Sequence, residues 1–212
     1  MATPIIYGTD MSTYVRTVRM AFEEASAPYE RVDVSVVRGE CKEQPHLARN
    51  PFGTVPAFEH DGMMFYETSA ISRYVDQVWA HDSLTPVDAR DRARMNQIIS
   101  IVDYNGYASI IWQIVVHRLL PQLVGGTDEK VIAAAVPRAE LCLKEWDRIK
   151  GAGKFLAGDK LSLADLYVAP LLSYLALAPE APLIAANKGI AAWWEIIQQR
   201  ESYKKTAPNL AG

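Results

Sequence analysis

The spacing of apolar residues changes once along this chain, about eighty residues in, and this change limits the possible folds. Before it, strand and helix signals alternate: Ile5–Tyr7 is a short apolar run, and a repeat with helical spacing begins at Val15. After the stretch HDSLTP at 81–86, only helical patterns occur. The sequence therefore predicts two domains, an α/β domain over 1–80 and an all-helical domain over 86–212.

The first domain has the predicted order β-α-β, a loop, and then β-β-α. Val32–Val36 alternates as a half-buried strand, and Asp61-Gly62 between two apolar runs is typical of a two-residue hairpin turn. Pro56 opens the third strand, although proline cannot donate to a sheet ladder. This combination is typical of a thioredoxin-like architecture, in which the proline is cis and the backbone of Val55 faces an extended peptide. The alternative is that Pro56 only ends a loop.

Composition excludes several classes of function. The chain has 22 basic and 25 acidic residues, a net charge of −3, and no basic run, so nucleic acid is not an expected partner. No apolar run approaches the ~18 residues of a membrane helix, and because the first residues lack a charged and an apolar region we expect no secretion signal. The two cysteines are too few for a disulfide framework. We expect a cytoplasmic protein without a metal, because the histidines show no ligand spacing: His46, His60, His81 and His117.

Two helix starts and one lysine in a loop could contribute to binding an anionic ligand. Ser12 occupies the expected N-cap of the first helix, where a hydroxyl could donate to a thiolate, or could simply cap the helix. Glu67 and Thr68 begin another helix, where an anion could bind, or again serve only as a cap. Lys42 could supply a positive charge for a carboxylate, or be an ordinary surface lysine. No histidine–carboxylate pair marks Ser12 as the nucleophile of a hydrolase.

Three segments, in this order along the chain, resemble the glutathione transferases. They are YGTDMST with the following VRTVRMAFEE, NPFGTVPAFEHDGMMFYETSAISRYV at 50–75, and KFLAGDKLSLADLYVAPLL at 154–172. The resemblance runs from Ile5 to about Tyr203 and is closest to the serine-type members, the phi-like and bacterial ones. It implies the fold of the cytosolic glutathione transferases: an α/β N-terminal thioredoxin-like domain plus an all-α C-terminal helical domain.

The resemblance also implies a glutathione site in the first domain, formed by Ser12, Cys41, Lys42, Thr54, Val55, Pro56, Glu67 and Thr68. Ser12 would lie at the glutathione sulfur, and the backbone of Val55 would pair with the cysteinyl part. Glu67 and Thr68 would hold the γ-glutamyl end, and Lys42 would meet the glycyl carboxylate.

Two positions depart from the family pattern. Cys41 stands where phi-like members often have histidine, and Thr54 stands where glutamine is common. Both shorten a polar side chain, so weaker glutathione binding is a hypothesis that Cys41→His would test. Cys41 could alternatively form a mixed disulfide with glutathione. Tyr7 is a rival to Ser12, because tyrosine-type members use a tyrosine near the end of the first strand.

The resemblance places an electrophile pocket between the domains, against Met11 on one side. The other side would be a stripe of a long helix predicted from Pro86 to Leu120, formed by Tyr107, Ile111, Trp112 and Val115. Such a stripe could instead be helix core. The resemblance also implies a homodimer with Phe52 and the long helix near its interface, and a structural role for Asp165 in a capping box.

The function implied is that of a glutathione transferase in detoxification. Glutathione is the co-substrate, no metal takes part, and the Ser12 hydroxyl with the helix N-terminus activates the thiol as a thiolate. The thiolate is then conjugated to a small hydrophobic electrophile. Two alternatives remain open on the same residues: a glutathione-dependent peroxidase, and a non-catalytic regulator that binds glutathione or another ligand.

Overall fold

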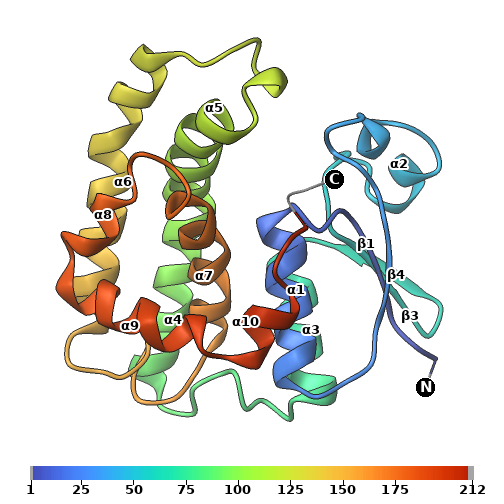
Figure 1. Cartoon of the computed structure of the whole chain (residues 1–212). Helices are drawn as coiled ribbons and strands as arrows, with labels where there is room; N and C mark the ends of the chain where they lie inside the picture. Colours follow the sequence, from blue (N-terminus) through green and yellow to red (C-terminus); the bar gives the residue numbers. More distant parts are fainter. Residues whose placement is uncertain (1, 210–212) are drawn as a thin grey trace. The chain divides into compact units, whose positions relative to one another are not determined.

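The computed structural model describes residues 2–209, which form two compact units. The first unit contains the chain up to Ser83 together with the segment from Arg200 onward, and the second contains Leu84–Gln199 (Figure 1). The division falls between the boundaries at 80 and 86 expected from the sequence. The segment from Arg200, however, groups with the first unit and not with the helices that precede it.

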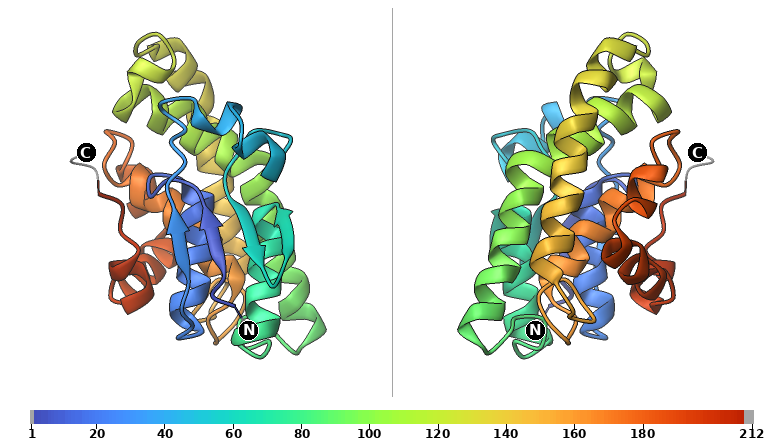
Figure 2. Two further views of the ribbon diagram at one scale, coloured as in Figure 1. Left: turned by 90° about the vertical axis from the view of Figure 1, so that its right-hand side faces the viewer. Right: turned by 90° about the vertical axis from the view of Figure 1, so that its left-hand side faces the viewer.

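The first unit is built on a four-stranded sheet with the order β2-β1-β3-β4, whose strands lie side by side in the left view of Figure 2. Strand β1 pairs in parallel with β2 and antiparallel with β3, which pairs antiparallel with β4. The hairpin turn lies at Asp61 and Gly62, where φ is 46° and 79°, as the primed hairpin turns require. The strands are β1 Ile5–Tyr7, β2 Glu30–Val32, β3 Ala57–His60 and β4 Met63–Tyr66.

Strand β2 ends at Val32, where the sequence predicts a strand over Val32–Val36. A turn at Ser35 explains the difference. The Ser35 N–H donates to the Glu40 carboxylate at 2.7 Å, and the Glu40 N–H donates to the Ser35 carbonyl at 3.0 Å. Because these polar groups are satisfied locally, the alternating valines do not join the ladder.

Short helices and two long helices cover the two faces of this sheet. The helices α1 (Thr13–Glu24) and α3 (Thr68–Trp79) pack against each other and over Phe58. The other face carries η1 (Glu40–Lys42) and α2 (His46–Arg49). The final helix of the described chain, α10 (Glu201–Lys205), packs on α1.

The second unit is helical throughout its regular structure. Its first long helix is continuous over α4 (Ala89–Ile101), η2 (Val102–Val115) and α5 (Val116–Leu119), and η3 (Pro121–Leu123) follows. This agrees with the single long helix predicted up to Pro121. The other helices are α6 Glu129–Lys150, α7 Leu163–Leu175, α8 Pro182–Ala185 and α9 Lys188–Gln198.

The segment η2 is a π-helix, which the sequence analysis did not predict. At its end the Val116 N–H bonds to the Ile111 carbonyl, five residues back. Gly106 permits a close approach within this segment, since a Cβ there would lie 3.2 Å from the Trp146 ring. Within this segment a buried residue occurs at every fourth position: Val102, Gly106, Ile110 and Ile114. Because an α-helix also tolerates this spacing, the apolar pattern does not indicate the π geometry.

Asp165 has the structural role that the sequence predicts. Its fully buried carboxylate accepts hydrogen bonds from the Leu156 N–H, the Ser162 N–H and hydroxyl, and the Trp193 indole N–H. The bond from the Ser162 N–H to Asp165, and that from the Asp165 N–H to the Ser162 side chain, form a complete capping box at the start of α7. Among the described residues, no helix is both long enough and apolar enough to cross a membrane.

Candidate functional site

Ser12 caps the N-terminus of α1. Its Oγ accepts the Val15 N–H at 3.3 Å, and its carbonyl accepts the Arg16 N–H at 2.9 Å. The side chain is half-buried. A hydroxyl that accepts one hydrogen bond can still donate its own proton, so capping and donation to a ligand are compatible. The peptide dipoles of α1 also favour negative charge at this end.

Gly8 brings the end of β1 against two other parts of the site. A Cβ at this position would lie 2.4 Å from Val15 Cγ2 and 3.1 Å from Val55 Cβ. Val15 belongs to the first turn of α1, and Val55 belongs to the loop before β3. A residue without a side chain is therefore needed here for the helix N-terminus and the Val55 loop to approach the same strand end.

The Val55–Pro56 peptide bond is cis. Val55 is half-buried and precedes the ladder, whose first β1–β3 pair joins Tyr7 and Ala57. Its backbone is therefore outside the paired part of β3, which leaves it in a position to meet an extended peptide. Thr54 before it is exposed.

Two buried side chains support this loop, and the sequence analysis assigned neither of them to the site. The Thr54 carbonyl accepts the Asn50 amide at 2.9 Å and lies 2.8 Å from His46 Nε2. Because a carbonyl only accepts, Nε2 carries the proton, and the Nδ1 lone pair of His46 is left without a partner among the described residues. The signal in the sequence was the NPFG run that begins at Asn50, a polar residue directly before a turn.

Glu67 adopts an uncommon backbone conformation at the start of α3. It occupies the N-cap position with φ 73°, in the left-handed region that costs a non-glycine residue roughly 1–2 kcal/mol. Its side chain is exposed and makes no capping bond, whereas Thr68 beside it is buried. A strained position that keeps a charged side chain where glycine would fit more easily is typical of a ligand site.

Lys42 crosses the backbone of the same loop region. Its Nζ donates to the Phe52 carbonyl at 3.1 Å. Its side chain also passes close to Gly53, where a Cβ would lie only 2.7 Å from Lys42 Cδ. The ammonium is solvent-exposed and therefore accessible to an anion. Gly53 itself has φ 60°, so the close approach and the backbone both favour glycine.

Comparison with known proteins places this geometry in a family. Residues 6–80 match the family model described as "Glutathione S-transferase, N-terminal domain", and residues 104–201 match "Glutathione S-transferase, C-terminal domain". Glutathione S-transferase 1 from Zea mays is 32% identical, with 98% of this chain and 97% of the relative covered. The chain belongs to the glutathione S-transferase family.

Further relatives of the glutathione S-transferase family agree over the whole length. Glutathione S-transferase F7 from Arabidopsis thaliana is 30% identical, with 97% of this chain and 99% of the relative covered. The crystal structure of glutathione transferase F7 from Populus trichocarpa has a TM-score of 0.87 at 30% identity, covering 97% and 98% of the two chains. A structure of glutathione S-transferase-I bound with lactoylglutathione has a TM-score of 0.86 at 30% identity, covering 97% and 99%. The serine-type, phi-like resemblance fits these plant relatives.

Tyr7, the alternative to Ser12 as the residue that would activate the thiol, interacts with Glu59 and Arg49. Its hydroxyl donates to Glu59 at 2.7 Å, and the Arg49 guanidinium lies 4.2 Å from the ring centroid. Burial and the hydrogen bond to the Glu59 carboxylate raise the pKa of Tyr7. A phenol whose hydroxyl already donates its hydrogen bond to a carboxylate is poorly suited to stabilise a thiolate, so the geometry favours Ser12.

Cys41 lies inside the transferase's first unit. The side chain is 5% exposed and packs with Tyr7, Val34 and Ala57. A thiol enclosed in this way is poorly accessible to a disulfide partner, which favours a packing role over the redox alternative. A histidine at this position would have to fit into the same packed cluster.

The residues predicted for the electrophile pocket belong to two different units. Met11, in the first unit, is half-buried. In the second unit Tyr107 is half-buried, and burial raises the pKa of its hydroxyl. Ile111 and Val115 are buried, and Trp112 is 48% exposed. That these five residues line one pocket stays a prediction.

No metal site is found within residues 2–209, where no three His, Cys, Asp or Glu side chains gather in a group that could hold an ion.

Proposed function

We propose that this chain binds glutathione along its first unit and ionises the thiol for conjugation to a hydrophobic electrophile. The observation that supports this most directly is the approach of two ligand-competent elements at Gly8. The N-terminus of α1, with the Ser12 hydroxyl, and the Val55 loop both contact this glycine position. A tripeptide whose backbone pairs with Val55 would therefore place its cysteinyl sulfur close to Ser12.

The two ends of glutathione carry charges, and the first unit offers matching groups. We assign the γ-glutamyl end to Glu67 and Thr68, where an exposed carboxylate can meet the ammonium and the start of α3 can meet the carboxylate. We assign the glycyl carboxylate to Lys42. Thr54 stays in the site as an exposed residue beside the tripeptide, whereas the buried Cys41 would act through the packing of its cluster. The hypothesis that these two residues weaken glutathione binding is retained.

The magnitude of thiol activation follows from two contributions. A hydrogen bond to a charged group contributes about 1.5–3 kcal/mol. A helix N-terminus adds about 0.3–1 kcal/mol for an anion near its first turn. Since one pKa unit corresponds to about 1.36 kcal/mol, the bound thiol should ionise roughly one to three units below the free thiol value of about 8.5. That range makes the thiolate abundant at neutral pH.

The remaining assignments rest on the family resemblance. Met11, Tyr107, Ile111, Trp112 and Val115 are proposed to contact the electrophile. On the same resemblance we propose a cytoplasmic location, a role in detoxification and a homodimer. Peroxide reduction would use the same thiolate, so a hydroperoxide belongs among the substrates tested.

The deciding experiment is the pH titration of bound glutathione, followed through the ultraviolet absorbance of its thiolate, in the parent and in Ser12→Ala. We expect a lowered thiol pKa in the parent and a return toward the free value in Ser12→Ala. Ser12→Thr is the matched control, since it keeps both a hydroxyl and a cap and should retain much of the shift. Thermal unfolding of each variant separates loss of the helix cap from loss of activation.

A parent protein that binds glutathione with an unshifted thiol would contradict the proposal. Such a result would favour the non-catalytic regulator.

A further inference from the structure

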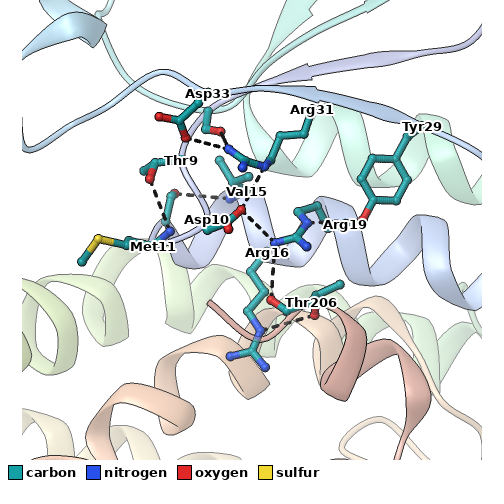
Figure 3. Close-up of polar contacts among 12 residues, drawn as sticks. Thr9, Asp10, Met11, Val15, Arg16, Arg19, Tyr29, Arg31, Asp33 and Thr206 are labelled. Carbon is teal, nitrogen blue, oxygen red and sulfur yellow. Dashed lines mark hydrogen bonds and ion pairs between the residues drawn. The ribbon is translucent and has the colours of Figure 1, made fainter. Parts of the chain in front are cut away.

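The loop that carries Ser12 is held by an ionic cluster (Figure 3). The Asp10 carboxylate accepts from Arg19 of α1 at 3.3 Å and from Arg31 of β2 at 2.9 Å. Arg31 also donates to the Gly8 carbonyl at 2.8 Å and to Asp33 at 2.7 Å. The short connection between β1 and α1 is thus held at Gly8 by a side chain of β2, and at Asp10 by side chains of β2 and of α1 itself.

Arg19 extends this cluster to the C-terminal segment of the chain. Besides Asp10, its Nη1 donates to the Thr206 carbonyl at 3.4 Å, and its Nε donates to the Tyr29 hydroxyl at 3.3 Å. The Arg19 side chain is 13% exposed, so these contacts are partly shielded from water. Thr206 is fully buried and donates to the Ser202 carbonyl at 2.7 Å, which fixes the carbonyl region that Arg19 contacts.

The C-terminal segment Arg200–Thr206 is docked along the same helix at further points. Arg16 is 1% exposed and donates to the Tyr203 carbonyl at 3.0 Å, with its guanidinium 4.3 Å from the centroid of the Tyr203 ring. At the other end of α1, Arg200 donates to Glu24 at 2.7 Å. Positions 16, 19, 23 and 24 share one face of a helix, so the segment binds a continuous polar seam on α1.

We propose that Arg19 is a positioning residue for the Ser12 loop and that it couples this loop to the docked C-terminal segment. The same guanidinium nitrogen, Nη1, donates to the Asp10 carboxylate and to the Thr206 carbonyl. Release of Thr206 would free Arg19 to move, and Asp10 would lose a partner that limits the loop. The inference rests on the proposed function, because it assigns the support of the same Ser12 hydroxyl.

The proposal predicts different effects on kcat and on KM. Arg19 donates to Asp10, Tyr29 and Thr206. None of these residues is among those proposed to bind the tripeptide, Val55, Glu67 and Lys42, so KM for glutathione should change little when Arg19 is replaced. The placement of the Ser12 hydroxyl should suffer instead. We expect Arg19→Met to lower kcat about fivefold, the size of a modest coupling between two sites, and to raise the pKa of the bound thiol.

The experiment compares Arg19→Met, Arg19→Lys and Asp10→Asn with Arg200→Met as the matched control. Arg200→Met removes one cation from the same seam but leaves Asp10 and Thr206 in place. Hydrogen exchange in the ligand-free protein is measured first: Arg19→Met should speed exchange in peptides covering residues 8–13, and Arg200→Met should not. Arg19→Lys should recover part of kcat, and it serves in place of the methionine variant should that variant unfold.

A double variant and a truncation complete the test. Arg19→Met combined with Asp10→Asn should lower kcat little more than the stronger single variant, because both weaken the same Arg19–Asp10 contact. A chain that ends at Tyr203 removes Thr206 but keeps Arg19 and Asp10. Faster exchange at 8–13 in that chain supports the coupling, whereas unchanged exchange overturns it.

The hydrogen-exchange readout is independent of whether glutathione is the substrate. Unchanged exchange of the loop in Arg19→Met overturns the positioning role, whatever the activity of the parent. A looser loop with an unchanged kcat and thiol pKa overturns it as well. A parent that does not bind or ionise glutathione, with a loop that still loosens in Arg19→Met, refutes the proposed function but not the link between Arg19 and the loop.

Discussion

The replacement Gly8→Ala tests whether the approach of three elements at the end of β1 is as tight as the structure indicates. The new Cβ would lie 2.4 Å from Val15 Cγ2 and 3.1 Å from Val55 Cβ, both inside van der Waals contact. Val15 is fully buried, and protein interiors are close-packed, so its side chain can give way only by displacing its neighbours. The substitution must therefore displace the first turn of α1, the Val55 loop, or both.

The expected cost is large for a single methyl group. Overpacking a well-packed interior costs about 1–3 kcal/mol, and a contact this short should reach about 3 kcal/mol. A chain of this size loses about 2–4 °C of Tm for each kcal/mol, so Tm should fall by about 6–12 °C. Glutathione affinity should fall too, since a displaced Val55 no longer presents its backbone correctly.

The assay is a double-mutant cycle on the free energy of unfolding with Gly8→Ala, Val15→Ala and the pair. Val15→Ala has its own cost, because it removes buried methyl groups, but it also removes the clashing Cγ2. We expect the pair to be more stable than the sum of the single effects by at least about 1 kcal/mol. Additive effects, or a Gly8→Ala protein as stable as the parent, would refute this account of the strand end.

Two further predictions concern groups already described. Tyr7→Phe should destabilise the fold by about 1–2 kcal/mol through loss of the bond to Glu59, and should leave the bound thiol pKa unchanged in the same titration. The pKa of Tyr7 is raised above its usual 10.0, so the folded state holds this proton where the unfolded phenol releases it. Stability should therefore fall as pH rises past about 10, and less steeply in Tyr7→Phe. Asp165→Ala should cost about 3–5 kcal/mol in chemical denaturation, because it leaves several buried donors without an acceptor. The exposed Asp159→Ala, which loses a single backbone bond, should cost far less.

The sequence predicts those parts of the fold that depend on local spacing. The Asp61-Gly62 turn, the Ser12 and Ser162 caps and the end of the long helix at Pro121 each follow from residues within a few positions of one another. The π geometry of η2 does not follow, since an apolar repeat of four fits both kinds of helix. The hydrogen bond to the fifth residue back, as from the Val116 N–H to the Ile111 carbonyl, distinguishes them in the structure.

The residues that hold the site's loops in place are harder to predict from the sequence than the residues proposed to contact the ligand. Ser12 and Glu67 were identified because they begin helices, which is a local signal. Asn50 and His46 were missed as supporting residues because their role appears only when both meet the Thr54 carbonyl. The Arg19 contacts were missed for a similar reason, since Thr206 is 187 residues away in the chain.

The capping bond at Ser12 limits how its hydroxyl can act. Because Oγ accepts the Val15 N–H, its own proton points away from that N–H and out of the helix. A thiolate that accepts the proton must then lie beyond the N-terminus of α1, where the peptide dipoles already favour negative charge. Capping and activation are therefore one geometry, and Ser12→Ala removes both at once. Ser12→Thr keeps a hydroxyl at the same place on the helix, as both acceptor and donor. A retained shift of the thiol pKa in Ser12→Thr, together with its loss in Ser12→Ala, would therefore assign the effect to the hydroxyl and not to a general loss of structure.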